Sequence, residues 1–176
     1  MATKSQNIEE VVEKTEAPKV EKEELDLDKT VTVRSISDWT TGFARLNTIG
    51  DVQITPNGTY RMTRAEIIAQ TQNNNALFNG IDGKGSHATL YIEDRPTRVE
   101  VGFESEDGET QQLILSDDLI KRVFNEKTKT AFEREFKNSF VTRAEQRSVM
   151  NSITRLKIND YNRIRFAENY TGMQAK

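Results

Sequence analysis

Short runs of alternating hydrophobic and polar residues follow one another between residues 30 and 115. Alternation with a period of two, rich in β-branched and aromatic residues, is typical of strands that bury one face. The pattern predicts strands at 30–36, 51–54, 58–62, 87–92, 98–103 and 110–115.

Two turn signals join four of these strands into hairpins. Thr55-Pro56-Asn57-Gly58 combines a proline, which fixes φ, with asparagine and glycine, which accept positive φ. A second turn is centred on Asp107 and Gly108. We therefore predict hairpins over residues 51–62 and 98–115.

Residues 38–46 contain the only tryptophan of the chain and predict a loop between the first strand and the first hairpin. Trp39 and Phe43 lie four residues apart in this otherwise polar segment. We expect both to pack onto the sheet and to fix the path of the chain. The competing interpretation makes them exposed anchors for a partner subunit.

The first helix is predicted to begin at Arg64. Thr63 and Glu66 have the spacing of a capping box, in which the threonine oxygen accepts the N3 amide and the glutamate accepts the N-cap amide. Three consecutive asparagines at 73–75 limit the length of this helix.

Hydrophobic residues recur with helical spacing through the last third of the chain. They predict three helices, at 117–137 after Ser116, at 142–156 after a second capping box, and at 160–171 before Gly172. Phe132 and Phe136 lie one turn apart on the first of these helices, and we expect both in the core.

The predicted fold class is α+β: a small, mostly antiparallel sheet with one packed helix, followed by a C-terminal three-helix subdomain. The predicted boundaries are an acidic arm at 1–28, a β-rich domain at 29–115, a basic helical subdomain at 116–172 and a tail at 173–176. A chain of 176 residues suits one domain with appendages better than two full-sized domains.

Residues 1–28 carry nine acidic side chains and no aromatic residue. Such a segment cannot bury enough apolar surface to offset its ordering entropy, so we expect an extended or disordered arm. Ile8, Val11 and Val12 could form one helical turn on a partner. The arm is therefore predicted either to order on a neighbouring subunit or to act as a solubilising tail.

The net charge of −3 conceals an asymmetry along the chain. Residues 1–29 carry 5 basic and 9 acidic side chains (−4), residues 30–118 carry 7 and 13 (−6), and residues 119–176 carry 13 and 6 (+7). A basic end can steer contacts with subunits or with nucleic acid. The candidate contacts on the last two helices, which resemble a helix-turn-helix in outline, are Arg143, Arg147, Arg155, Lys157, Arg163 and Arg165. Solvated faces of packed helices are the alternative interpretation.

Composition excludes several kinds of site. The chain has no cysteine, which excludes disulfides, thiolate zinc sites, iron–sulfur clusters and cysteine nucleophiles, and fits assembly in a reducing cytoplasm. We expect no signal peptide, because residues 1–16 lack an apolar stretch, and no membrane segment, because no run approaches the roughly 18 apolar residues required.

No pattern predicts a catalytic, cofactor or metal site, and we expect the protein not to be an enzyme. The glycine-rich loop before His87 does not match a P-loop, because Lys84 is followed by Gly85 and then by a predicted strand. His87, the only histidine, is predicted at a strand start with Ser86 on the opposite face. The carboxylates at 93–94 and 104–109 fall on predicted turns.

The segments 38–50 (DWTTGFARLNTIG), 63–94 and 156–172 (LKINDYNRIRFAENYTG) resemble small structural proteins of tailed bacteriophages that infect Gram-positive bacteria. The resemblance implies a multi-copy, non-enzymatic virion component of the head or the head–tail junction, assembled in the host cytoplasm. Its partners would be other virion or assembly proteins in a homo- or hetero-oligomer, without a membrane. The alternative is a nucleic-acid-binding module that acts through the basic C-terminal helices.

Overall fold

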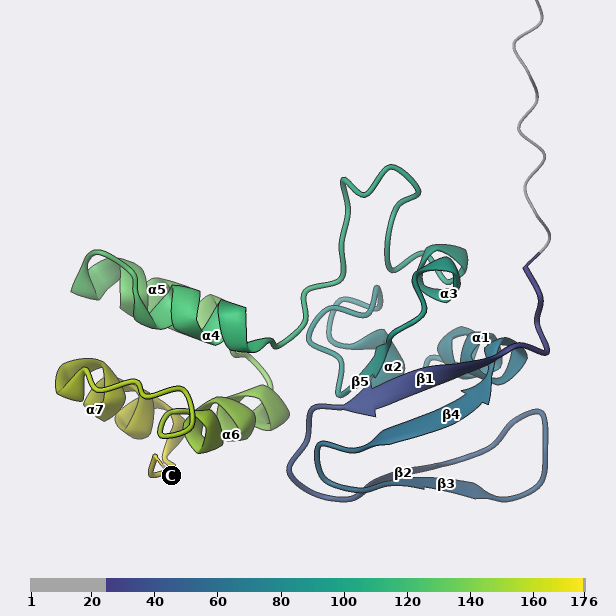
Figure 1. Cartoon of the computed structure of the whole chain (residues 1–176), viewed down its shortest axis with the longest axis horizontal. Helices are drawn as coiled ribbons and strands as arrows, with labels where there is room; N and C mark the ends of the chain where they lie inside the picture. The colour runs from purple at the N-terminus through teal and green to yellow at the C-terminus, as the bar shows by residue number, and fades with distance from the viewer. Residues whose placement is uncertain (1–24, 176) are drawn as a thin grey trace, which may run out of the picture.

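The structure is a computed structural model that describes residues 25–175, and Figure 1 shows these residues in two lobes. Residues 25–115 form the sheet lobe, with β-strands and three helices. Residues 116–175 form the helical lobe. The predicted α+β class is confirmed for the described residues.

The central strand of the sheet lobe is β1 (Thr30–Ser35). It runs antiparallel to β4 (Thr59–Thr63) on one side and to β5 (Leu90–Ile92) on the other. Val33 is opposite both Tyr60 and Ile92. Because Val31 and Val33 are buried while the residues between and after them are half-buried, the alternation predicted for this strand matches its burial.

A separate two-stranded sheet joins β2 (Thr41–Ala44) to β3 (Asp51–Ile54), with Phe43 opposite Val52. The predicted hairpin over 51–62 is therefore wrong, and the predicted loop over 38–46 contains the strand β2. The turn itself forms, since the Gly58 amide donates to the Thr55 carbonyl at 2.9 Å. The strands on either side of it pair with different partners, because pairing depends on which faces are buried together and not on the turn alone.

The second predicted hairpin, over 98–115, is also wrong. Residues 95–100 form the helix α3 (Arg95–Glu100), and residues 110–115 contain no strand. Asp94 caps α3 by accepting the Thr97 amide at 3.1 Å and the Thr97 hydroxyl at 2.6 Å, and Pro96 lies in its first turn. These two helix-start signals outweigh the alternation of the sequence that follows.

His87 does not begin a strand, because β5 starts three residues later at Leu90. Its backbone φ is 60°, in the left-handed region. The preceding loop folds so tightly that a Cβ on Gly80 would lie 2.0 Å from the Ser86 carbonyl oxygen. The loop therefore requires glycine at position 80 and turns the chain away from an extended path.

The sheet lobe carries three helices, α1 (Arg64–Gln72), α2 (Ala76–Asn79) and α3, where one was predicted. Thr63 caps α1 by accepting the Glu66 amide at 3.3 Å. Only this half of the predicted capping box forms. The Glu66 carboxylate instead accepts hydrogen bonds from the loop between β2 and β3.

The helical lobe, residues 116–175, contains four helices: α4 (Asp117–Phe124), α5 (Lys129–Ser139), α6 (Arg143–Ser152) and α7 (Tyr161–Thr171). The single predicted helix over 117–137 is broken after Asn125, because Thr128 caps a new helix by accepting the Ala131 amide at 3.2 Å. The capping box of α6 and the left-handed Gly172 after α7 are confirmed. Helix α6 ends at Ser152 and not at residue 156 as predicted. Lys157, further along, adopts a φ of 56°, in the left-handed region.

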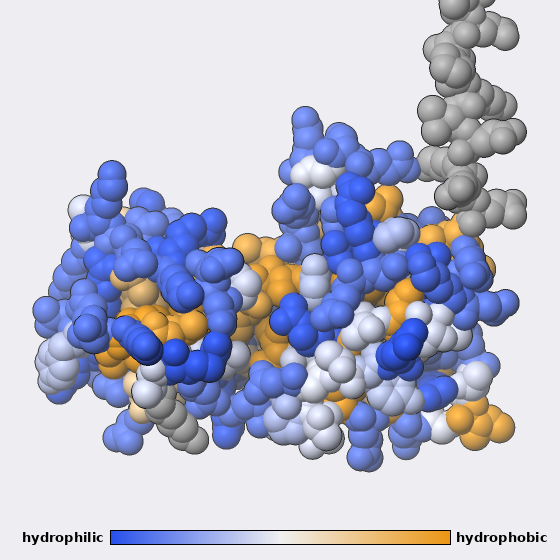
Figure 2. Space-filling view, in the orientation of Figure 1, coloured by the Kyte–Doolittle hydropathy of each residue, from blue (hydrophilic) through white to orange (hydrophobic). Residues whose placement is uncertain are grey.

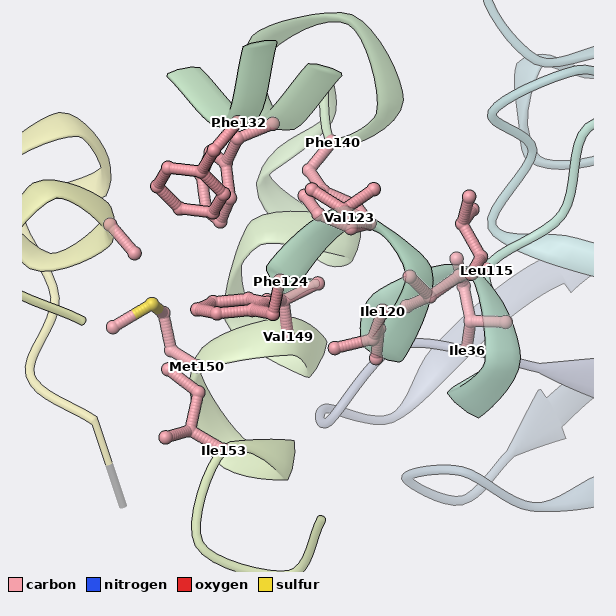
Figure 3. Close-up of a cluster of buried hydrophobic side chains, with 13 residues drawn as sticks. Ile36, Leu115, Ile120, Val123, Phe124, Phe132, Phe140, Val149, Met150 and Ile153 are labelled. Carbon is pink, nitrogen blue, oxygen red and sulfur yellow. The ribbon is translucent and has the colours of Figure 1, made fainter. Parts of the chain in front are cut away.

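Each lobe has a hydrophobic core. In the sheet lobe, Val33, Ile67, Phe78 and Leu90 are fully buried. Figure 3 shows the helical core, in which side chains from α4, α5 and α6 converge. Ile36, just after β1, belongs to this second core, so the sheet strand and the helices pack together.

The predicted arm at 1–28 lies mostly outside the described residues. Residues 26–29, at the end of this arm and just after it, are held to α1. The Leu27 carbonyl accepts the Ala65 amide, the Lys29 carbonyl accepts the Arg64 amide, and the Arg64 guanidinium donates to the Asp26 carbonyl. Across residues 25–175, no helix has the length and apolar character that crossing a bilayer requires.

Candidate interaction surfaces

Two of the six basic residues predicted as contacts join separate elements of the fold. Arg147 in α6 donates to Asp38, which follows β1, at 2.7 Å. Arg155, after α6, forms two hydrogen bonds of 2.6 Å each with Asp117 in α4. The Arg155 guanidinium lowers the pKa of the Asp117 carboxyl, and that carboxylate raises the pKa of Arg155. Both arginine charges are therefore balanced inside the chain.

Two further arginines bind carbonyl oxygens at helix ends. Arg143 donates to the Thr171 carbonyl at 2.7 Å and so ties the start of α6 to the end of α7. Arg163 donates to the carbonyls of Phe124 and Glu126 at the end of α4. These guanidiniums satisfy carbonyls in the last turn of a helix or just after it, which no amide of that helix reaches.

The remaining two basic residues bind neither a carboxylate nor a backbone carbonyl among residues 25–175. Arg165 donates to the Tyr161 hydroxyl at 3.1 Å and lies 5.9 Å from the centroid of that ring. Lys157 has no hydrogen-bond or ion-pair partner for its amine among residues 25–175. The structure thus does not bring the six predicted residues together as one basic face.

Trp39 and Phe43, the predicted aromatic anchors, lie in different environments. Phe43 is half-buried and packs edge-to-face against the buried Phe78 at 5.4 Å between ring centroids. Trp39 is 40% exposed. The expected core position of Trp39 is therefore wrong, because the turn after β1 directs it outward, and the alternative of an exposed residue describes it better.

The loop between β2 and β3, residues 45–50, presents two aliphatic side chains to solvent, and we call it the hairpin tip. Leu46 is 46% exposed, and Ile49 is wholly exposed. The Arg45 amide donates to the Gly50 carbonyl at 3.0 Å and closes the loop. No sequence pattern distinguished Leu46 and Ile49, because single aliphatic residues in a polar loop have no periodicity.

The hairpin tip is fixed from beneath by Glu66, a buried residue of α1. Its two carboxylate oxygens accept the amides of Leu46 at 2.8 Å and Asn47 at 2.9 Å, and Gln70 donates to it at 2.8 Å. Burial opposes ionisation, but these hydrogen bonds and the nearby Arg45 charge outweigh it and hold the pKa of Glu66 below its usual value. The exposed aliphatic side chains therefore stand on a preorganised backbone.

Helices α5 and α7 border a groove of about 590 Å³ in the helical lobe, the α5–α7 groove. Phe132 and Phe166 line it, with their ring centroids 5.5 Å apart. Lys129 and Arg165 line it as well. Figure 2 shows hydrophobic residues between α5 and α7, ringed by hydrophilic ones.

A second cavity, of about 490 Å³, lies where the lobes meet. Its lining is rich in hydroxyl and amide groups, with Ser35 and Asn57 from the sheet lobe and Ser148, Asn151 and Ser152 from the helical lobe. In the part of the chain that the structure describes, no group of three or more histidine, aspartate or glutamate residues is placed to hold a metal ion.

His87 also has an interlobe partner that its sequence position did not indicate. Its Nδ1 lies 2.8 Å from Oε1 of Glu145, the capping-box glutamate of α6. The Glu145 side chain is 2% exposed and the His87 side chain 14%. This contact and the bond between Asp38 and Arg147 fix the helical lobe against the sheet lobe.

Comparisons with protein-family models, with curated proteins and with solved structures found no match to this chain.

Proposed function

We propose that the chain is a non-enzymatic assembly protein that binds neighbouring protein subunits through the hairpin tip. The observation that carries the proposal is the wholly exposed Ile49, beside the half-exposed Leu46, on a loop held in place by a buried carboxylate. A single exposed aliphatic residue needs no explanation. Two of them on a loop that a buried Glu66 holds rigid provide an anchor that loses little further entropy on binding.

Trp39 adds to this interpretation, since exposed tryptophans are common among the residues that dominate binding energies. The setting that we propose is the virion of a tailed bacteriophage, in the head or at the head–tail junction. The sequence resemblance supports this setting.

The nucleic-acid alternative has less support from the geometry. Of the six basic residues that suggested it, two pair with carboxylates and two bind backbone carbonyls within the described residues. Binding to phosphates would have to release these partners or rely on Arg165 and Lys157 alone. Tight duplex binding that falls steeply with salt, measured in a filter-binding titration, would favour this alternative.

Size-exclusion chromatography with light scattering tests the proposal. We expect the wild-type chain to show a mass above the 20.1 kDa of one chain, increasing with concentration. The double variant Leu46→Asp/Ile49→Asp should shift to monomer and keep a cooperative melting transition, because neither side chain belongs to a hydrophobic core. Ile81→Asp is the matched control, an exposed isoleucine (60%) on another loop, and should assemble normally.

Mass spectrometry of purified virions then tests the setting. Recovery of this chain in many copies per particle would support it. A chain that is monomeric at all concentrations and absent from virions would contradict the whole proposal.

A further inference from the structure

We infer that the α5–α7 groove binds the acidic N-terminal segment of a neighbouring copy of this chain, at residues 7–17. The inference rests on the proposed function, since it presupposes that copies of the chain assemble. It goes beyond that function by identifying the segment of one copy and the surface of the other copy that bind each other.

The groove has the chemistry of a site for an acidic amphipathic segment. Phe132 and Phe166 supply apolar surface, and Lys129, with a side chain 85% exposed, and Arg165 supply positive charge. Beside the groove, the Lys137 ammonium lies 5.8 Å from the ring centroids of both Phe166 and Tyr170.

The acidic residues of the groove do not cancel this charge. Asp160 is bonded to Arg163 at 3.1 Å, so that pair is neutral. Glu133, with a side chain 30% exposed, lies 3.7 Å from Lys129, so that ion pair is loose. Arg165 and Lys137 have no carboxylate partner among residues 25–175. The groove therefore presents aromatic surface with an excess of cations.

The N-terminal sequence has the complementary pattern. Ile8, Val11, Val12 and Thr15 have the i, i+3, i+4, i+7 spacing by which an amphipathic helix lies in a groove. The residues between and after them include Glu9, Glu10, Glu13 and Glu16. Residues 1–24 contain seven acidic and four basic side chains (−3), against +7 for residues 119–176. Opposite charges of this size favour association and set its orientation.

The donor of the segment is a second copy. Figure 1 shows the described chain beginning at the side of the sheet lobe away from α5 and α7. Within one chain the segment would have to run past the sheet lobe to reach the groove. A neighbouring copy has no such constraint, and each exchange leaves that copy's groove free for the next, so that identical contacts can propagate into a ring or an array.

Photo-cross-linking of the full chain tests the inference. Val12 is replaced by p-benzoylphenylalanine, the chain is mixed with an isotopically heavy copy, and cross-linked peptides are identified by mass spectrometry. We expect light-to-heavy cross-links from position 12 to the peptides of α5 and α7. Cross-links only within one chain, or to other elements, would overturn the inference.

Charge reversal provides the control. Lys129→Glu/Arg165→Glu should lower the yield of these cross-links about tenfold, because the two cations that attract the acidic segment are replaced by carboxylates that repel it. Lys121→Glu/Arg122→Glu makes the same change in charge on α4, at residues that do not line the groove, and should leave the yield unchanged. Equal yields in both double variants would overturn the inference.

Light scattering on the same mixtures separates this inference from the proposed function. Assemblies that form without the cross-link, and that require Leu46 and Ile49, would overturn the groove inference and leave the function standing. A monomer throughout would overturn both.

Discussion

Phe136 is the side chain whose truncation should destabilise the helical lobe most. It is fully buried, and the rings of five aromatic residues surround it at centroid distances of 5.0–6.0 Å: Phe124, Phe132, Phe140, Phe166 and Tyr170. Four of these five pairs are edge-to-face, the arrangement that the ring quadrupole favours. Phe136→Ala therefore removes the centre of a cluster contributed by three helices.

The magnitude follows from these contacts. Truncating a buried phenylalanine costs about 3–5 kcal/mol, and edge-to-face pairs contribute about 0.5–1.5 kcal/mol each beyond their burial. Because such pair terms do not add in full, we expect Phe136→Ala to cost about 4–5 kcal/mol. In a chain of this size each kcal/mol lowers the melting temperature by about 2–4 °C. The expected decrease is therefore roughly 8–20 °C.

Thermal melts followed by far-ultraviolet circular dichroism measure this decrease. Phe136→Leu keeps most of the volume and should lose less than half as much. Tyr161→Ala removes a ring that is 66% exposed and should change the melting temperature by no more than about 2 °C. A decrease below about 4 °C for Phe136→Ala would refute the reasoning, because it would mean that the cluster does not support the lobe.

Four further predictions concern the contacts around the sheet lobe. Glu66→Gln should speed amide hydrogen exchange at Leu46 and Asn47 and cost about 1–3 kcal/mol in urea unfolding, since a buried charged acceptor is lost; unchanged exchange would contradict the role of Glu66. The pKa of Glu66 in the folded protein lies below its unfolded value of about 4.3. Ionised Glu66 therefore stabilises the fold fully above pH about 4.3, and this stabilisation is lost as the pH falls through the folded pKa. The urea midpoints of the wild type and Glu66→Gln should converge in acid. Asp38→Ala should lower the free energy of unfolding by about 1–3 kcal/mol, because Arg147 and Asn151 both lose their partner. A urea midpoint equal to that of the wild type would show that the interlobe hydrogen bonds do not contribute to stability. Trp39 should emit at long wavelength and be quenched freely in the monomer, with Trp39→Ala nearly neutral for stability; protected emission would place it in a contact that the structure lacks.

The elements that the sequence predicted well are those whose signals are local. Thr142 and Glu145 satisfy each other within four residues, and Gly172 needs only its own left-handed backbone. The turn around Asn57 is equally local. Strand pairing is not, because β1 pairs with strands far along the chain, with Thr30 opposite Thr63 and Val33 opposite Ile92, and the choice depends on burial of both partners.

The candidate surfaces were less predictable for the same reason. The sequence identified basic residues by type, but Arg147 has its partner 109 residues away and Arg155 has its partner 38 residues away. Glu66 had the spacing of a capping residue and yet binds amides about 20 residues earlier in the chain. Whether a charged side chain is available to a partner is decided by such distant contacts.

The position of β1 has a mechanical consequence for an assembly protein. The N-terminal segment leads directly into this strand, which is hydrogen-bonded on both sides and is followed by Ile36 in the helical core. A pull on the segment would load two antiparallel ladders in shear, so several hydrogen bonds would have to break together. The bonds from Arg64 and Ala65 to residues 26–29 would take the strain before the ladders do. Tension between subunits would thus spread over both lobes before any part of the sheet could peel away.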